Sequence, residues 1–363
     1  MNTNKLAQSV RIIWAIAVKD VADAFRNRVI LQIVLTGLAV VALYKAIPTL
    51  IQSMDVARLH VYDTDGSVSI LLENSPDLDV RQYTSQRDME TFMMMGVAPE
   101  LGLIIPSGFE QAVQSGVPLQ LDGYVQYWVS PSEAGNLELQ LEGELASLLG
   151  RAVDVKLEGH KVYPGPFASY GPGGWAVLSM FVVLLMVGIS LVPHLMLEER
   201  QTRTLDSLLV SPASSSHVVL GKALAGLAFG LVGMVVVLVA NAALITQWAF
   251  AILATVCGLL LVIGVGLLLG VIFEVKQSLK MASGVLFTFA FVPVAIAGMA
   301  MDLPDVVNSA LRWIPTVALA RLFCIAQSNQ AVWADYGQDL AVVVVSIVLV
   351  LASVVHLVER SER

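Results

Sequence analysis

Few residues in this sequence have the types and spacing that covalent chemistry requires. The five histidines are scattered, and none forms an HExxH zinc motif. The sequence contains neither a GxSxG nucleophile motif nor a GxxxxGK[ST] phosphate-binding loop. Three consecutive methionines at 93–95 could bind a soft metal, but filling an apolar core is the more usual role of methionine. We therefore expect no catalytic site, no metal site and no nucleotide cofactor on this chain.

A second set of chemically suggestive residues is polar and lies in or beside apolar segments. Polar groups within a membrane usually face protein or a water-filled cavity, so such residues are candidates for lining a transport pathway. We interpret His194, which follows Pro193, as part of a kinked helix with its ring hydrogen-bonded, in preference to a transport role. The remaining pathway candidates are Asn241, Arg312 and Arg321.

The composition indicates a membrane protein. Hydrophobic residues make up 56% of the 363 residues and charged residues 14%, against roughly 45–50% and about 25% in soluble domains. The net charge of −8 is carried mostly by one polar stretch, near residues 53–170, which argues against nucleic acid as a partner. The chain therefore combines long apolar runs with one domain of ordinary soluble composition.

Six apolar runs are long enough to cross a membrane. A bilayer core of about 30 Å needs about 20 apolar residues in a helix. The runs that qualify are residues 29–51, 174–197, 218–246, 249–273, 281–301 and 340–358. The sequence thus predicts a polytopic α-helical membrane protein with six transmembrane helices.

The distribution of basic residues predicts the orientation of these spans. Lysine and arginine precede the first span, occupy every second loop after it and end the tail at 359–363. Because cytoplasmic loops carry an excess of basic residues, both termini should be cytoplasmic. Residues 52–173 then form an extracytoplasmic domain inserted between the first and second transmembrane helices.

The extracytoplasmic domain should have an α/β fold. Strand-like runs, LHVYD, LDVRQY, LGLIIP and VQYWV, alternate with helix-like segments at 67–73, 87–95 and 107–116. Residues 163–174 are interpreted as a semi-rigid linker into the second span. The segment 302–339 is apolar enough to enter the membrane but too short to cross it, and Pro315 interrupts it, so we expect a re-entrant hairpin there.

Two cytoplasmic segments have patterns of their own. Residues 1–28 form an amphipathic helix that can lie along the membrane surface, either to anchor the first span or to dock a partner. The loop 198–217 contains a leucine stripe beside charged residues and should include a short helix that ends near Pro212.

These segments resemble one protein family. The run EERQTRTLDSLLVSP followed by GK resembles the segment of type 2 ABC transporter (ABC-2) permeases that usually contains an acidic pair, then GTLE, LL, SP and GK, with Arg203 in place of the usual glycine and Asp206 in place of glutamate. KDVADAFRNR resembles the stretch before their first span. The polar runs DTDGS, LGLIIPSGF and SGVPLQLDG resemble the subgroup with a large outer domain.

The resemblance implies a partner that hydrolyses ATP. Such permeases pair with a separate ABC ATPase subunit, which holds ATP and Mg²⁺, and work as a homodimer or with a sister permease in the bacterial inner membrane; a periplasmic adaptor is a further candidate partner. The expected docking residues in the coupling segment are Glu198, Glu199, Arg200, Arg203, Thr204, Leu205, Asp206, Leu208 and Leu209. Those expected in the N-terminal helix are Lys19, Asp20 and Arg26.

Two glycine pairs complete the candidate residues. Gly226 and Gly230, and Gly266 and Gly270, each lie on one side of a helix and permit close approach of another helix. Packing within one subunit is the expected role and a dimer face is the alternative.

The function implied by the resemblance is ATP-driven export of amphipathic or lipid-like compounds or drugs. Ion export by a permease of the same family is one alternative. A membrane sensor with an extracytoplasmic ligand-binding domain is another, and a membrane enzyme is a third.

Overall fold

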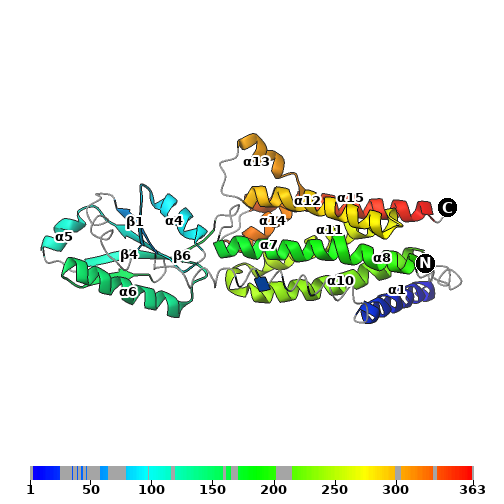
Figure 1. The fold of residues 1–363 in the computed structure, drawn as a ribbon, viewed down its shortest axis with the longest axis horizontal. Helices are drawn as coiled ribbons and strands as arrows, with labels where there is room; N and C mark the ends of the chain where they lie inside the picture. Colours follow the sequence, from blue (N-terminus) through cyan, green and yellow to red (C-terminus); the bar gives the residue numbers. More distant parts are fainter. Residues whose placement is uncertain are drawn as a thin grey trace. The chain divides into compact units, whose positions relative to one another are not determined.

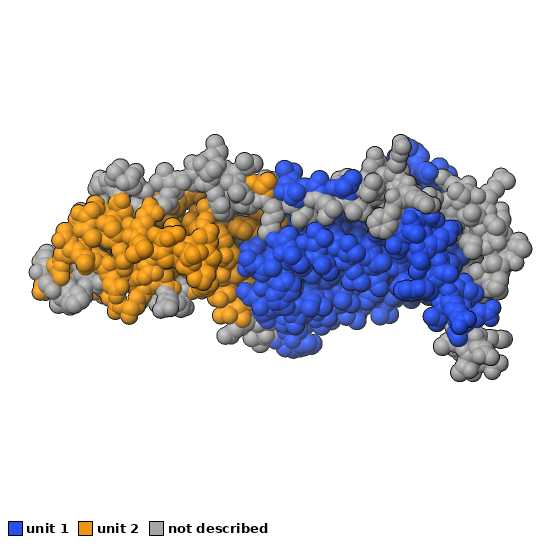
Figure 2. Space-filling view, turned by 90° about the horizontal axis from the view of Figure 1, so that it is seen from below, with its two compact units in different colours: residues 1–43, 176–326, 330–363 blue, residues 44–175, 327–329 orange. Residues whose placement is uncertain are grey.

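The computed structural model describes most of the chain. The described residues are 3–24, 58–63, 79–96, 98–115, 119–157, 161–164, 171–201, 215–298, 304–329 and 333–361, with isolated positions between 35 and 46. They form two compact units, shown in Figure 2. We call residues 44–175 and 327–329 the sheet unit, and residues 1–43, 176–326 and 330–363 the helical unit.

The sheet unit contains one mixed six-stranded sheet. Its strands are β1 (Arg58–Asp63), β2 (Asp79–Tyr83), β3 (Leu101–Ile105), β4 (Leu119–Gln126), β5 (Val153–Lys156) and β6 (Lys161–Val162). The order is β2-β1-β3-β4-β5, and β6 also pairs with β4. Only the β3–β4 pairing is antiparallel. The predicted α/β fold is therefore present in this part of the chain.

Helices cover both faces of the sheet (Figure 1). On one face, alternating residues such as Leu59, Val61 and Leu103 form an apolar core with α5 (Phe109–Ser115) and α6 (Pro131–Leu149). On the other face lies α4 (Gln86–Met95). A side chain at Gly102 of β3 would collide with the Met93 sulfur at 2.6 Å, so this glycine permits the close packing of α4.

Several predictions for the sheet unit need correction. The last predicted strand, at 125–129, overlaps only the end of β4, because the chain turns at Tyr127. Helix α6 was not predicted, although Ser130 and Glu133 form a capping box at its start. The predicted linker 163–174 is shorter, since α7 begins at Gly171. The helix predicted at 67–73 lies outside the described residues.

The helical unit is built from α1 (Thr3–Ala24) and a bundle of longer helices. The second predicted span is one continuous helix made of α7 (Gly171–Leu185), the π-helical segment η1 (Met186–Leu191) and α8 (Val192–Gln201). It is followed by α10 (Ser215–Ala240), the short 3₁₀ helix η2 (Ala242–Leu244), α11 (Trp248–Ile272), α12 (Lys276–Gly298), α13 (Asp305–Leu311), α14 (Pro315–Ile325) and α15 (Trp333–Ser361).

Five helices among the described residues are long and apolar enough to cross a membrane. They are α7 with η1 and α8, then α10, α11, α12 and α15, and they match the last five predicted spans with shifts at their ends. The first predicted span, 29–51, lies almost entirely outside the described residues. The structure therefore agrees with a polytopic membrane protein, and a sixth span stays a prediction.

The segment 302–339 contains more helix than the sequence indicated. Pro315 does not interrupt a helix but occupies the first turn of α14, where proline is well tolerated because no N–H is needed there. Helix α15 begins at Trp333, so the last residues of this segment, including Asp335 and Asp339, are helical. Most of α14 is buried in the core of the helical unit. The re-entrant path itself stays a prediction.

Candidate functional site

The coupling segment predicted to dock an ATPase begins at the end of α8. Glu198, Glu199 and Arg200 lie in the last turns of this helix, which ends at Gln201. Arg203, Thr204, Leu205, Asp206, Leu208 and Leu209 lie outside the described residues, and the chain is described again from Ser215, at the start of α10. Docking by these residues therefore stays a prediction.

The N-terminal helix α1 has two distinct faces. Ile16, Ala17 and Asp20 are buried, at 7%, 3% and 6% exposure. Val10, Trp14 and Val18 lie on another face at spacings of four and are 50–62% exposed. Helix α1 packs along α10 through its buried face. A helix is thus present within the predicted segment 1–28, and it packs against α10 through one stripe.

A buried ion pair joins these two helices. The Nζ atom of Lys222 on α10 lies 2.9 Å from the carboxylate of Asp20, and the two side chains are 4% and 8% exposed. Asp20, predicted to dock an ATPase, meets another helix of the same chain here, and docking by this residue stays a prediction. Lys19 is exposed, and Arg26 lies outside the described residues.

The residue before Lys222 explains how closely the helices approach. A side chain at Gly221 would meet Cγ2 and Cβ of Ile16 at 2.6 and 2.8 Å and the carbonyl oxygen of Ile13 at 3.3 Å. Glycine is therefore required for α1 to lie at this distance from α10. The two residues GK, noted in the sequence as one short motif, have separate structural roles.

The predicted glycine pairs pack within the chain. Side chains added at Gly226 and Gly270 would meet Val192 at 2.6 Å and Met196 at 2.5 Å, respectively, both on α8. One at Gly230 would collide with Leu259, and one at Gly266 with the backbone carbonyl oxygen of Gly188. All four positions are thus covered by other helices of the helical unit. This arrangement favours the packing role over a dimer face.

The polar pathway candidates have protein partners. The amide of Asn241 donates to Ser179 Oγ at 3.3 Å and to the Val237 carbonyl at 2.9 Å. Arg321 Nε on α14 lies 3.0 Å from Asp339 on α15, whose side chain is fully buried. These contacts tie helices together. His194 and Arg312 are partly buried.

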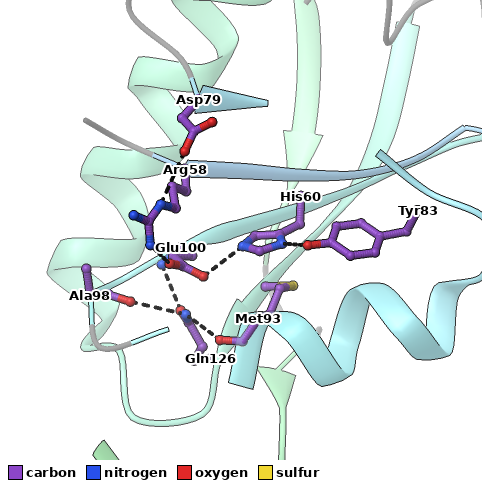
Figure 3. Close-up of polar contacts among 8 residues, drawn as sticks. All are labelled: Arg58, His60, Asp79, Tyr83, Met93, Ala98, Glu100 and Gln126. Carbon is purple, nitrogen blue, oxygen red and sulfur yellow. Dashed lines mark hydrogen bonds and ion pairs between the residues drawn. The ribbon is translucent and has the colours of Figure 1, made fainter. Parts of the chain in front are cut away.

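The sheet unit contains a polar network that the sequence analysis missed (Figure 3). His60 on β1 contacts Glu100 through Nε2 at 2.7 Å and the Tyr83 hydroxyl through Nδ1 at 2.8 Å. Arg58 lies 3.2 Å from Asp79 and 3.4 Å from Glu100. His60 and Glu100 are each 3% exposed. The signal for this network was the polar His60 between Leu59 and Val61 in a strand.

Gln126 connects the network to α4. Its side chain accepts from the Glu100 amide at 2.9 Å and donates to the carbonyls of Met93 and Ala98, each at 3.2 Å. These bonds satisfy backbone groups where α4 ends and the chain enters β3. Burial raises the pKa of Tyr83 above its ordinary value of 10.0, although nearby Arg81 acts in the opposite direction.

The polar network of the sheet unit and the Asp20–Lys222 ion pair both hold secondary-structure elements in place. Among the described residues, no group of three or more histidine, cysteine, aspartate or glutamate side chains could hold a metal ion. The network beneath α4 positions strands, and the Asp20–Lys222 pair positions helices.

Comparison with known proteins identifies the family. No curated protein matches the chain significantly. The family model described as ABC-2 family transporter protein matches residues 28–355. This range includes four of the five described candidate spans in full, α15 up to residue 355, and the whole sheet unit between its first and last strands. The chain therefore belongs to the ABC-2 family of transporter proteins and is a transport permease.

Proposed function

We propose that this chain is the membrane-spanning subunit of an ATP-driven exporter, which moves amphipathic or lipid-like compounds or drugs out of the cytoplasm or the inner leaflet. The observation that carries the proposal is the family match over residues 28–355. The lack of a phosphate-binding loop in the sequence supports a separate ATPase chain. The permease would act as a homodimer or with a sister permease.

The proposed mechanism starts at the coupling segment. ATP binding closes the paired ATPase subunits, and the segment 198–217 of each permease moves with the ATPase cleft that holds it. This segment begins in the last turn of α8 and ends in the first turn of α10, so its displacement acts on two helices directly. The permease would then alternate between inward and outward access, driven by the different affinities of the ATP and ADP states.

The proposed cargo class is inferred from the apolar surfaces of the candidate spans, which would line the transport pathway. Three of the five candidate spans, α10, α12 and α15, expose long apolar surfaces, and ligand sites in proteins are predominantly apolar with a few polar groups. The sheet unit would face the extracytoplasmic side and shape the exit of the cargo. Both termini would be cytoplasmic, with the basic residues that precede the first span.

The first test is co-purification from native membranes followed by an ATPase assay. An ATPase should accompany the wild-type permease, and Leu205→Asp in the coupling segment should release it because a charge replaces an apolar contact. Leu205→Met is the matched control and should retain the ATPase. A wild-type permease that recruits no ATPase under several mild detergents would contradict the proposal and favour the sensor alternative.

A second experiment identifies the cargo class. The purified complex is reconstituted into liposomes, and ATP-dependent transport of a fluorescent amphipathic amine is compared with transport of Na⁺ and K⁺. Transport of the amphipathic probe alone supports the proposed cargo. Transport of an ion alone would replace it with ion export by the same family.

A further inference from the structure

We propose that Asp20 and Lys222 form a joint through which α1 and the adjoining end of α10 move as one body during transport. The inference rests on the proposed export function, and it assigns to these two residues a positioning role. They are 202 residues apart in the sequence, and each belongs to a segment that the sequence analysis noted separately. The structure brings these two segments into direct contact.

The geometry of the joint is that of a fully enclosed ion pair. Lys222 Nζ lies 2.9 Å from Asp20, and both side chains are almost completely buried. Around them, Ile16 and Ala17 of α1 are also buried, and Gly221 of α10 leaves room for Ile16. The charged groups are thus held between two helices whose backbones approach closely.

Stability alone does not explain a buried ion pair. Taking two charges out of water costs several kcal/mol per ion, and apolar residues of similar size often give an equally stable contact. A buried pair does define one register, because sliding or rotating α1 against α10 would separate two opposite charges that lie 2.9 Å apart. Apolar side chains would tolerate such a slip.

The ion pair lies close to the coupling segment, where a fixed register between α1 and α10 can transmit movement. Helix α10 begins at Ser215, within the end of the coupling segment, and Lys222 is in its second turn. A displacement of the coupling segment therefore reaches α10 first. Because Asp20 is held by Lys222, α1 moves together with α10. Helix α1 precedes the first predicted span in the sequence. A single movement of the ATPase would thus displace both α10 and, through α1, the first predicted span.

The main test replaces the ion pair with an apolar pair. The double variant Asp20→Leu, Lys222→Leu should fold and retain the ATPase, but it should hydrolyse ATP with export lowered about tenfold because α1 can slip. A matched double variant at an exposed acid of α1 and an exposed base of α12, Asp23→Leu with Lys280→Leu, should export like the wild type. Normal export by the Asp20→Leu, Lys222→Leu complex would overturn the joint.

A cross-linking experiment tests the same idea with the helices held together. In a background with Cys257→Ala and Cys324→Ala, Asp20→Cys and Lys222→Cys are bridged by a short bis-thiosulfonate reagent. Before bridging, export should be low; after bridging, it should return to within about threefold of the wild type, since a covalent link replaces the ion pair. Loss of export upon bridging would overturn the joint, because the helices would then have to separate.

These outcomes are distinct from failure of the proposed function. Export is compared only between complexes that contain the ATPase and hydrolyse ATP. Absence of an ATPase from the wild-type protein contradicts the exporter itself. Normal coupling in the apolar double variant, or its loss on bridging, contradicts only the joint.

Discussion

His60 and Glu100 illustrate how single residues hold the sheet unit together. Strand alternation places Leu59 and Val61 in the apolar core and directs His60 to the opposite face, beneath α4. There its ring has a partner at each nitrogen, Glu100 and Tyr83. Because buried polar groups are costly unless they are hydrogen-bonded, removal of one member should weaken the whole network.

Glu100→Ala should destabilise the sheet unit strongly. It leaves His60 buried with an unsatisfied nitrogen and Arg58 without one of its carboxylates, which should lower the free energy of unfolding by about 2–4 kcal/mol. Pulse proteolysis of the full-length protein in native membranes measures this change. The control is Asp122→Ala at an exposed carboxylate of β4, with an expected change within about 0.5 kcal/mol. Equal effects of the two variants would show that the network contributes little.

Tyr83 should give the sheet unit a dependence on alkaline pH. Its folded-state pKa lies above the ordinary 10.0 because of burial, so the folded protein holds the phenolic proton more tightly than the unfolded chain does. This contribution to stability is complete below pH 10.0 and is lost as the pH rises through the folded pKa. The difference in tyrosinate absorbance between the wild type and Tyr83→Phe measures the titration. Ionisation of Tyr83 at or below its ordinary pKa would contradict the prediction.

Among the elements, the second span has the least regular helix. Pro193 has no N–H, so it cannot make the α-helical bond to the Ile189 carbonyl. Ser283 of α12 donates to that carbonyl from its hydroxyl at 3.0 Å. The six-residue π-helical segment η1 lies just before Pro193. A neighbouring helix thus satisfies a backbone group that the second span leaves open, as membrane helices require.

Ser283→Ala should destabilise the helical unit. It leaves the Ile189 carbonyl without this donor, with an expected loss of about 0.5–2 kcal/mol. Ser346→Ala is the matched control, because Ser346 bonds only back along its own helix, to the Val342 carbonyl. Thermal unfolding in detergent, followed by fluorescence-detected size-exclusion chromatography, compares them. A larger effect at Ser346 would rule out the role given to Ser283.

The crossing of the second span with α11 should be intolerant of any side chain. At Gly266 an added Cβ would collide with the Gly188 carbonyl, which is backbone and cannot rotate away. Gly266→Ala should therefore lower the thermal unfolding temperature by several degrees, as an overpacked contact costs about 1–3 kcal/mol. Gly284→Ala on α12 meets open space and should be neutral or slightly stabilising, since alanine favours helix. The prediction fails if both variants unfold alike.

At the scale of the whole molecule, the sheet unit corresponds to the stretch of soluble composition in the sequence, and the helical unit corresponds to the long apolar runs. The sheet unit has a core covered by helices on both faces, whereas α10, α12 and α15 expose long apolar surfaces. Such surfaces are stable only in a lipid environment or against another subunit. The proposed topology places the two units in water and in the bilayer, respectively.

Thiol labelling of intact cells checks that topology. Ser132→Cys, on an exposed position of α6, should react with a membrane-impermeant maleimide before lysis. Arg360→Cys, near the end of α15, should react only after the membrane is opened. Both native cysteines are buried, which keeps the background low. Labelling of Arg360→Cys in intact cells would place the C-terminus outside and reverse the proposed orientation.

The sequence by itself determined the classes of structure and the family. Runs of about 20 apolar residues can be recognised without tertiary information, because the bilayer imposes a fixed length on each helix. Strand alternation and turn residues likewise indicated β1, β2 and β3 of the sheet unit. The ordered run before α10 identified the family, since it carries several residue types at fixed spacing.

Only the tertiary structure decided which residues meet. Lys19 and Asp20 are adjacent charged residues, and the same docking role was expected of both from the sequence. In the structure Asp20 is buried against Lys222, whereas Lys19 is exposed. Gly266 was predicted to face a helix, but its contact with Gly188 depends on how α11 crosses the second span. Such contacts join positions far apart in the sequence, and hydropathy and local spacing carry no information on long-range partners. They arise from the packing of whole helices.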